Sequence, residues 1–309
     1  MEPWLIDTDP GVDDALAILA AHRLPNVRVL AMTIAAGNVG IEHTVQNALK
    51  LTEVMGVETP VYVGAPKPLV RPADDAAFVH GLDGFGDIGY RPSKHLAEAE
   101  HAVAAMIRLA RQHAGKLNMI MLGPLTNLAL ALSLEPELPN LVKRLVIMGG
   151  AVTGRGNTER LPAEFNTGFD AEAAHIVFSH WPSFDLVDWE ATMAHGLPIA
   201  ELDQYLAADH DYARFYRAIS RKTRTWMSKE RHPTHWFAAD ALAMAAALWP
   251  EHVQEWQTRG LKVELEGRLS RGATLVDWTG RMGWPKNARI MMRYSLPDFG
   301  RFVGTALGA

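Results

Sequence analysis

The segment LIDTDPGVDDALAI, residues 5–18, decides the fold because a strand, a turn and a helix follow one another within it. An apolar run leads into the segment, and the residues after Asp14 have the composition of a helix. Four carboxylates, Asp7, Asp9, Asp13 and Asp14, lie within this short stretch. Because like charges at such density repel one another, we expect a positively charged group to lie among them.

The composition is that of a globular protein. The chain has 309 residues, of which 48% are hydrophobic and 21% charged, and this is ordinary for a sizeable core. The net charge of −5 is mild and no run of Lys or Arg is present, so we predict no binding to nucleic acid. The chain contains no cysteine, which excludes disulfides, thiolate metal ligands and cysteine nucleophiles.

The sequence gives no sign of a membrane segment or a secretory leader. The longest apolar run, residues 241–249, is far shorter than the roughly 20 residues that a membrane-spanning helix needs. The first residues lead straight into acids, without a basic region followed by a long apolar one. We therefore expect a cytoplasmic protein that does not enter a membrane.

Strand-like and helical patterns alternate over the first two thirds of the chain. Strands are predicted at 4–6, 27–34, 61–64, 117–123, 143–150 and 183–188, and helices at 13–24, 41–55, 95–113 and from residue 126. This alternation predicts an α/β fold with an open, mainly parallel, Rossmann-like sheet flanked by helices. Helices at 209–229 and 237–249 and β-like runs near 261, 273 and 288 predict a helical and β C-terminal elaboration. No linker separates these parts, so we expect one domain over residues 1–309.

Polar residues follow several of the predicted strands. In open parallel sheets, ligands bind beyond the carboxyl ends of the strands. Any one of these residues is common in loops, but their convergence at one sheet edge predicts a site. The residues in question are Asn38, His80, Thr126, Asn157, Glu164 and Asn166.

The acidic loop predicts a metal site at the same edge. A helix N-terminus accounts for one or two of its carboxylates. A hard cation such as Ca²⁺ or Mg²⁺ accounts for the rest, because it takes carboxylates, backbone carbonyls and waters together. Zinc is a poorer fit without cysteine. A phosphoryl-transfer loop of the haloacid-dehalogenase type is disfavoured, because Gly11 stands where that pattern needs a hydroxyl or β-branched residue.

With these motifs in order, the sequence resembles the nucleoside hydrolases, the inosine–uridine-preferring N-ribohydrolases. The resemblance is carried by DTDPGVDDALAI, AAGNV, HGLDGFG, LGPLTNLA, AEFN, ADALAMA and RGATLVDW, and covers almost the whole chain. It implies an enzyme that uses Ca²⁺ to hydrolyse the N-glycosidic bond of ribonucleosides, giving ribose and free base. It also implies a small nucleoside as the partner and a homo-oligomer, either a dimer or a tetramer.

The resemblance also implies a role for each site residue. Asp9, Asp14 and Asp240 would give carboxylate ligands to the metal, and Thr126 its backbone carbonyl. Asp13 would be the general base that takes a proton from the metal-bound water. The ribose hydroxyls would be held by Asn38, Asn157, Glu164 and Asn166, and His80 would lie in the loop that closes over the sugar. Asp7 is expected to be structural, bonded to backbone amides.

The pattern departs from the family before Asp240. Pyrimidine-preferring members carry a histidine there and purine-specific members a tryptophan, whereas this chain has Ala239. Two readings of the segment upstream stay open. His235 or Trp236 reaches the base, or the histidines are solvated and Trp236 packs on the helix.

Several choices stay open at this stage. Thr158 is an alternative to Asn157 because the spacing between Asn157 and Glu164 is about one residue longer than in the pyrimidine-preferring members that the sequence resembles. Tyr216 or Trp226 could line the base pocket, or could belong to the hydrophobic core.

Two other functions are weighed. One is a non-catalytic protein that binds calcium and ribose, and the other is a hydrolase of another N-riboside with a good leaving group. The base preference is undetermined.

Overall fold

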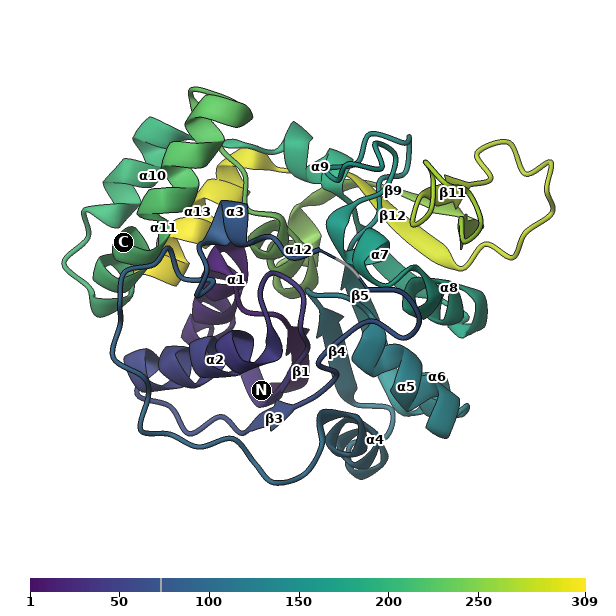
Figure 1. The fold of residues 1–309 in the computed structure, drawn as a ribbon, viewed down its shortest axis with the longest axis horizontal. Coiled ribbons are helices and arrows are strands. Elements are labelled where there is room, and N and C mark those ends of the chain that lie inside the picture. The colour runs from purple at the N-terminus through teal and green to yellow at the C-terminus, as the bar shows by residue number, and fades with distance from the viewer. Residues whose placement is uncertain (73) are drawn as a thin grey trace.

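An eight-stranded sheet forms the centre of the protein (Figure 1). The computed structural model describes residues 1–72 and 74–309. The strand order is β3-β2-β1-β4-β5-β6-β12-β9, and all neighbours are parallel except β12 and β9. The strands are β1 (Glu2–Thr8), β2 (Val27–Ile34), β3 (Val61–Val63), β4 (Leu117–Met121), β5 (Val142–Met148), β6 (Phe184–Val187), β9 (Val253–Arg259) and β12 (Ala288–Tyr294). The predicted α/β class with a mainly parallel sheet is confirmed.

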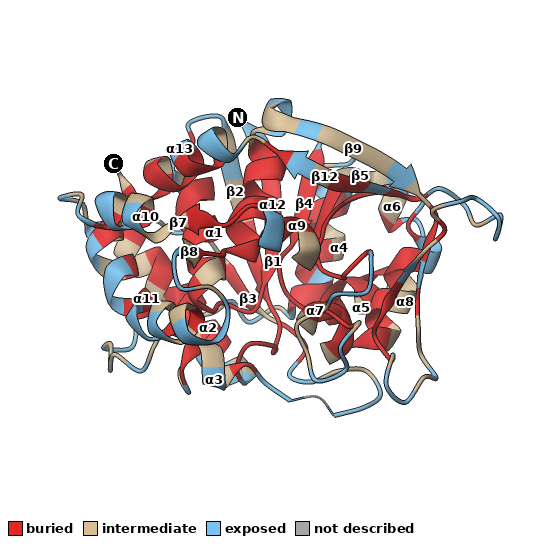
Figure 2. Ribbon diagram, turned by 90° about the horizontal axis from the view of Figure 1, so that it is seen from above, coloured by how far each residue is buried: buried red, intermediate tan, exposed pale blue. Residues whose placement is uncertain are grey.

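Helices cover both faces of the sheet, and the alternation of side chains along each strand explains why both faces are apolar. In β1, Ile6 packs into one core cluster and its neighbour Leu5 into the other, as the period of two in a strand requires. The first cluster includes α1 (Val12–Arg23), α2 (Ile41–Met55), α11 (Asp211–Glu230), α12 (Ala239–Leu248) and α13 (Leu296–Leu307). The second includes α4 (Ala102–Gln112), α5 (Thr126–Leu134) and α8 (Ala171–His180). Figure 2 shows the buried centre between these layers.

The remaining elements are short and lie between these or beside the sheet. They are α3 (Ala77–His80), α6 (Leu138–Leu141), α7 (Phe165–Phe169), α9 (Trp189–Ala194), α10 (Ile199–Leu206), a 3₁₀ turn (Pro250–His252), and the strand pairs β7 (Leu197–Pro198) with β8 (His235–Trp236) and β10 (Leu261–Val263) with β11 (Thr274–Val276). In the part of the chain that the structure describes, no helix has the length and apolar character needed to cross a bilayer.

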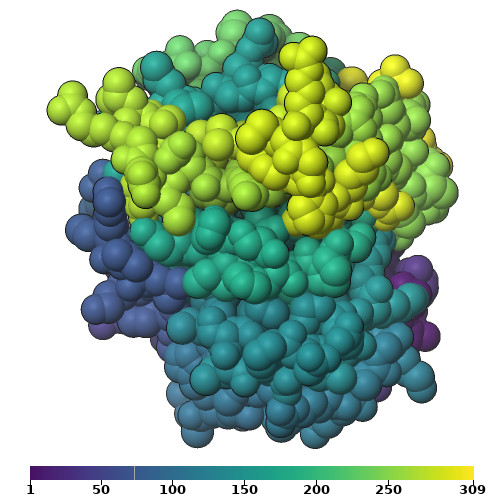
Figure 3. Space-filling view, turned by 90° about the vertical axis from the view of Figure 1, so that its right-hand side faces the viewer, coloured from purple at the N-terminus to yellow at the C-terminus, as the bar shows by residue number. Residues whose placement is uncertain are grey.

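The start of one predicted helix differs from the structure. The helix predicted at 95–113 begins only at Ala102, because residues before it run beside β3, where the Glu98 N–H donates to the Val61 carbonyl at 2.8 Å. The predicted helical and β elaboration is present in the C-terminal third, and part of it belongs to the main sheet. Its strands β12 and β9 extend that sheet, whereas β10 with β11, and β8 with β7, form two-stranded sheets of their own. Figure 3 shows these C-terminal residues, in yellow-green and yellow, lying on teal residues from the middle of the chain.

The strand order places a crevice between β1 and β4. Order 3-2-1-4-5-6 is that of doubly wound sheets, in which connections leave the middle strands in opposite directions and ligands bind beyond their carboxyl ends. Asp9 follows β1 directly, and the Gly123–Thr126 segment follows β4. The acidic loop therefore lies at the topological switch point.

Candidate functional site

Asp9 is held at the bottom of this crevice between two glycines. A Cβ atom on Gly37 would overlap Asp9 Oδ2, and one on Gly123 would overlap Asp9 Oδ1. The backbone N–H of Asn38 donates to Asp9 Oδ2 at 2.7 Å. The loops after β2 and β4 thus close tightly around this carboxylate because they have no side chain at these two points.

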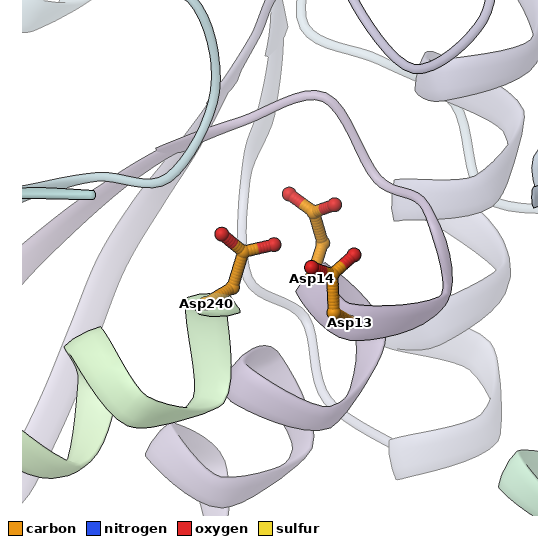
Figure 4. Close-up of side chains that lie close together, drawn as sticks. All are labelled: Asp13, Asp14 and Asp240. Atoms are coloured by element: carbon orange, nitrogen blue, oxygen red, sulfur yellow. The ribbon is translucent and has the colours of Figure 1, made fainter. Parts of the chain in front are cut away.

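Two helix N-termini bring three further carboxylates together. Asp13 and Asp14 lie in the first turn of α1, and Asp240 lies in the first turn of α12. One carboxylate oxygen from each lies within 4.8 Å of the others, a grouping that could hold a metal ion (Figure 4). Helix N-termini favour negative charge, so both helices help to hold the acids in place.

Asp14 is the most firmly fixed of these acids. It accepts hydrogen bonds from the Thr8 hydroxyl at 2.5 Å, from the Gly11 N–H at 2.9 Å and from the Asn38 amide at 3.0 Å. The same Asn38 amide also donates to the Asp9 carbonyl at 3.1 Å. Asn38, predicted to hold a ribose hydroxyl, therefore also links the metal-ligand candidates Asp9 and Asp14.

The electrostatics of the four neighbouring carboxylates favour a bound cation. Burial, followed by the charge of Asp14, raises the pKa of Asp9. Burial, followed by the charge of Asp13, does the same to the pKa of Asp240 and Asp14. Burial raises the pKa of Asp13 to about 6. Four oxygen-donor groups whose ionised forms are so disfavoured fit a hard divalent cation, which would neutralise them and which prefers oxygen ligands.

Asp7 is structural, but not in the way that the sequence predicted. Its Oδ2 accepts hydrogen bonds from the side chains of Thr33, at 2.6 Å, and Asn127, at 2.9 Å, rather than from backbone amides. Thr33 lies opposite Asp7 in β2, so the parallel register brings the hydroxyl to it. Asp7 therefore ties β1 to β2 and α5 below the site.

Thr126 opens α5 beside the cluster but is not among the residues that line the pocket. Its hydroxyl donates to Asp170 Oδ2 at 2.7 Å, and Asp170 also accepts from the Leu69 N–H at 2.9 Å. Asp170 thus links the start of α5 to the segment that contains Leu69. The metal-binding role of the Thr126 carbonyl stays a prediction.

His80 ends the short helix α3 and is buried against the acidic loop. Its Nδ1 accepts a hydrogen bond from the Val12 N–H at 3.1 Å, and its Nε2 lies 4.0 Å from Asp13 Oδ1. Burial lowers the pKa of His80 to about 4. The imidazole is therefore neutral near pH 7, with its proton on the nitrogen that faces Asp13.

Asn157, Glu164 and Asn166, which were predicted to bind the sugar, line the same pocket from the loop after β5 and the start of α7. The Glu164 carboxylate accepts from the N–H groups of Gly150, Asn166 and Thr167 at 2.9 to 3.1 Å, and burial raises its pKa to about 7. The Asn166 amide donates to the Leu122 carbonyl at 2.7 Å. Protein groups therefore fix the orientation of both side chains.

The structure distinguishes Asn157 from Thr158, its alternative in the sequence analysis. Asn157 lines the pocket, and its buried Oδ1 has no hydrogen-bond partner among the described residues. Thr158 does not line the pocket, and its hydroxyl donates to the Ala163 carbonyl at 3.1 Å. A buried acceptor without a partner, on a residue that lines the pocket, favours Asn157 over Thr158 as the candidate for binding a ligand.

Besides the polar residues described above, the pocket has an extensive apolar and aromatic lining. Its volume is about 760 Å³ with the open mouth included. Ala239 lines it beside Asp240 with only a methyl group. The apolar and aromatic part of the lining, called here the outer wall, is formed by Phe78, Val79, Phe165, Trp189, Trp226, Met227, Trp236 and Phe237. Arg231 also lines the pocket, beside Trp189 and Trp226.

His235 and Trp236, the two residues proposed to lie near the base, point to opposite sides of strand β8. Consecutive residues of β8 point to opposite sides. Trp236 is 1% exposed and lines the pocket, whereas His235 is not among the lining residues and hydrogen-bonds with His232 and Thr234 at 3.1 and 3.0 Å. Tyr216 is buried in the core, behind the lining residues.

The sequence analysis named Trp226 and Trp236 as candidates for the base pocket, and both line it, but it missed the rest of the outer wall. Thr223 and Met227 share one helical face with Trp226, at i, i+3 and i+4, and Arg231 lies one turn further. This spacing could have identified them. Trp189 and Phe78 lie in short helices with no such pattern.

Comparison with known proteins agrees with the geometry of the site. The profile of the family described as inosine-uridine preferring nucleoside hydrolase matches residues 4–301. The chain belongs to this nucleoside hydrolase family. It is 36% identical to the inosine-uridine preferring nucleoside hydrolase of Leishmania major, with 96% of this chain and 94% of the relative covered. It is 35% identical to the non-specific ribonucleoside hydrolase RihC of Klebsiella pneumoniae, with 99% and 98% covered.

Solved structures of nucleoside hydrolases share the whole fold. An inosine-guanosine nucleoside hydrolase superposes with a TM-score of 0.92 at 30% identity, covering 99% of this chain and 98% of the other. The purine-preferring ribonucleoside hydrolase of Gardnerella vaginalis gives 0.89 at 29% identity, with 99% and 98% covered. This nucleoside hydrolase is therefore an N-glycosyl hydrolase, whose family acts on small nucleosides.

Proposed function

We propose that this enzyme uses Ca²⁺ to hydrolyse ribonucleosides to ribose and free base, with Asp13 as the general base. The observation that carries the proposal is the convergence of Asp13, Asp14 and Asp240 beside a pocket that Asp13 and Asp240 line together with several aromatic residues. The acidic residues suit a hydroxylated sugar that gains positive charge, and the aromatic residues suit a planar base.

Asp9, Asp14 and Asp240 would hold the ion, with the Thr126 carbonyl as a fourth protein ligand. All of these donors are oxygen atoms, as Ca²⁺ prefers. A bound Ca²⁺ would supply coordination sites for ribose hydroxyls and lower the pKa of a water molecule. Magnesium is the main competitor, because it also takes oxygen ligands.

Asp13 is best suited to take the proton from the attacking water. It lines the pocket and 23% of its side chain is exposed there, whereas Asp14 is buried and accepts three hydrogen bonds. A general base must reach its proton from within the cavity. His80 would present its Nε2–H to Asp13 or to the substrate, and thereby orient one of them.

The residues of the loop after β5 would orient the sugar. Glu164 and Asn166 are held rigidly by backbone groups, and Asn157 offers a free carbonyl oxygen. Breaking the bond between C1′ and the base gives the sugar oxocarbenium character, as in glycoside hydrolysis. The negative charge of the surrounding carboxylates stabilises this cation.

The test is the release of free ribose by the purified protein with added Ca²⁺. The substrates are inosine, guanosine, adenosine, uridine, cytidine and an aryl riboside whose nitrophenolate leaves without help. Release from natural nucleosides supports the proposal and names the base class. Release from none of them, with Ca²⁺ shown to be bound, contradicts it.

The identity of the ion is tested separately. The metal content of the protein as purified would be measured, and the stripped protein would be titrated with Ca²⁺ and with Mg²⁺. Full recovery of activity with Ca²⁺ alone supports the proposal, and full recovery with Mg²⁺ alone contradicts it. The predicted dimer or tetramer is a further proposal, and light scattering of the purified protein tests it.

A further inference from the structure

One buried side chain joins the segment that carries His80 to the acidic loop. Asn47 lies in α2 and is completely buried. Its amide nitrogen donates to the Pro10 carbonyl at 2.9 Å and to the Asp83 carbonyl at 2.8 Å. Its amide oxygen accepts a hydrogen bond from the Tyr90 hydroxyl. Asn47 therefore bridges two loops that are far apart in the sequence, and it uses both of its donors to do so.

The segment after His80 is closed by its own hydrogen bonds. The His80 carbonyl accepts from the Gly86 N–H at 2.7 Å. The Asp83 side chain accepts, through Oδ1, from the N–H of Phe85 at 2.7 Å and from that of Asp87 at 3.0 Å. Because these bonds cross the turn, a contact that fixes the Asp83 carbonyl also restricts His80.

A glycine allows Asn47 to approach this segment. A Cβ atom on Gly84 would come within 2.7 Å of Asn47 Nδ2, and the φ of Gly84 is 78°, a conformation that glycine adopts readily. The Thr223 hydroxyl donates to the Val79 carbonyl at 3.0 Å. The segment around His80 is therefore bonded to both α2 and α11.

We propose that Asn47 is a positioning residue, which holds His80 at its working distance from Asp13. This inference rests on the proposed ribonucleoside hydrolysis, in which His80 presents Nε2–H to Asp13 or to the substrate. The Val12 N–H orients the imidazole through Nδ1 at 3.1 Å. One hydrogen bond to the ring does not fix the backbone that carries it. Asn47 does so, because it ties that backbone to Pro10, in the same loop as Asp13.

Asn47 also contributes to stability, and the test must separate the two effects. Its removal leaves the buried carbonyls of Pro10 and Asp83 without this donor, which costs roughly 1–3 kcal/mol for an unsatisfied group. A lower activity in a single variant would therefore fit either role. A positioning role differs in one respect, since its effect on turnover must disappear when the imidazole of His80 is absent.

The test is a double-mutant cycle with kcat for a natural nucleoside as the readout. The proteins are the unchanged enzyme, Asn47→Leu, His80→Asn and the double variant. Asn47→Leu should lower kcat roughly tenfold, the value of one hydrogen bond. The double variant should have the same kcat as His80→Asn alone, because residues that act through one contact are not additive. Losses that multiply in the double variant would overturn the inference.

Asn118→Leu is the matched control. Asn118 is another buried asparagine, whose amide donates to the Pro3 carbonyl at 3.2 Å, and it does not line the pocket. Its substitution should lower the melting temperature and leave kcat unchanged. If Asn47→Leu does not fold, Tyr90→Phe replaces it in the cycle, because it removes only the hydroxyl that binds the Asn47 amide oxygen. In Tyr90→Phe kcat should fall roughly threefold, the value of a weak hydrogen bond, and only when His80 is present. An unchanged kcat there would overturn the inference.

A second measurement does not depend on activity. Nitrogen NMR of protein labelled with ¹⁵N at histidine reports which ring nitrogen carries the proton, and the signal that is missing in His80→Asn belongs to His80. The unchanged enzyme should show one tautomer, with the proton on Nε2. In Asn47→Leu this signal should become that of a mixture of tautomers, whereas in Asn118→Leu it should not change. An unchanged His80 signal in Asn47→Leu would overturn the inference.

Failure of this inference is distinguishable from failure of the hydrolase proposal. Multiplied losses in the cycle, with ribose released by the unchanged enzyme, would overturn the positioning role and leave the hydrolase proposal standing. No ribose from any substrate with the unchanged enzyme, the aryl riboside included, would overturn the hydrolase proposal and the catalytic use of Asn47 with it. The histidine spectra would then still decide whether Asn47 holds His80.

Discussion

His80 faces Asp13 through Nε2 at 4.0 Å, and the backbone N–H of Val12 decides which tautomer it presents. Since Nδ1 accepts that hydrogen bond, the proton of the neutral ring must lie on Nε2. Gly11 allows the approach, because a Cβ there would come within 2.7 Å of His80 Nδ1. The acidic loop therefore sets the orientation of a side chain that is nearly 70 residues away in the sequence.

Two amide substitutions distinguish the role of His80 Nδ1 from that of His80 Nε2. In His80→Asn the amide oxygen can replace Nδ1 and accept from Val12, but nothing replaces the N–H that faces Asp13. In His80→Gln the longer side chain can replace Nε2–H. We expect kcat to fall roughly tenfold in His80→Asn, the value of one hydrogen bond, and less in His80→Gln. Equal kcat values in the two variants, with unchanged melting temperatures, would contradict this role.

Asp13→Asn tests the general base. Asparagine keeps the size of the side chain but cannot accept a proton, so kcat should fall by roughly 10²- to 10⁴-fold. Calcium affinity, measured by isothermal titration calorimetry, should change little because the other three acids remain. A fall in affinity as large as that in Asp240→Asn would instead make Asp13 a metal ligand, which the grouping of Asp13, Asp14 and Asp240 also allows.

Removal of the ion should lower the thermal stability. Without a cation, the buried acids around Asp9 and Asp240 repel one another or must take up protons. A ligand present at a hundred times its Kd stabilises a folded protein by about 2.7 kcal/mol. For a chain of 309 residues this corresponds to a shift in Tm on the order of 4 °C. Calorimetry with EDTA, and then with excess Ca²⁺, measures it, and an unchanged Tm would contradict a resident ion.

The acidic end of the site was predictable from the sequence because its residues follow strands or begin helices. Asp9, Asn38 and Glu164 come after the strands β1, β2 and β5, so a parallel sheet must bring them to one edge. Asp240 was found only through resemblance to a family. No local pattern links it to Asp13, because the contact between α1 and α12 joins the two ends of the chain.

The outer wall could not be predicted as well, for physical reasons. Trp189 and Phe78 lie in helices of six and four residues, too short for a hydrophobic period to appear. His235 and Trp236 are adjacent in the sequence, and only the pairing of β8 with β7 decides which of them faces the cavity. Arg231 is an exposed residue at a helix end, and its contacts with the indoles of Trp189 and Trp226 depend on how separate segments pack together.

Gly37 and Gly40, both between β2 and α2, offer a matched pair of substitutions, because only Gly37 lies against Asp9. In Gly37→Ala the new methyl group would overlap the Asp9 carboxylate and crowd Pro124, so Asp9 must turn away. We expect Ca²⁺ affinity and kcat/KM each to fall roughly tenfold, the cost of weakening one charged contact. Gly40→Ala is the control, since a Cβ there meets nothing within 4 Å and its φ of −59° suits alanine. If both variants bind Ca²⁺ as the unchanged enzyme does, the position of Asp9 does not limit the ion. Asp13, Asp14 and Asp240 would then be its carboxylate ligands.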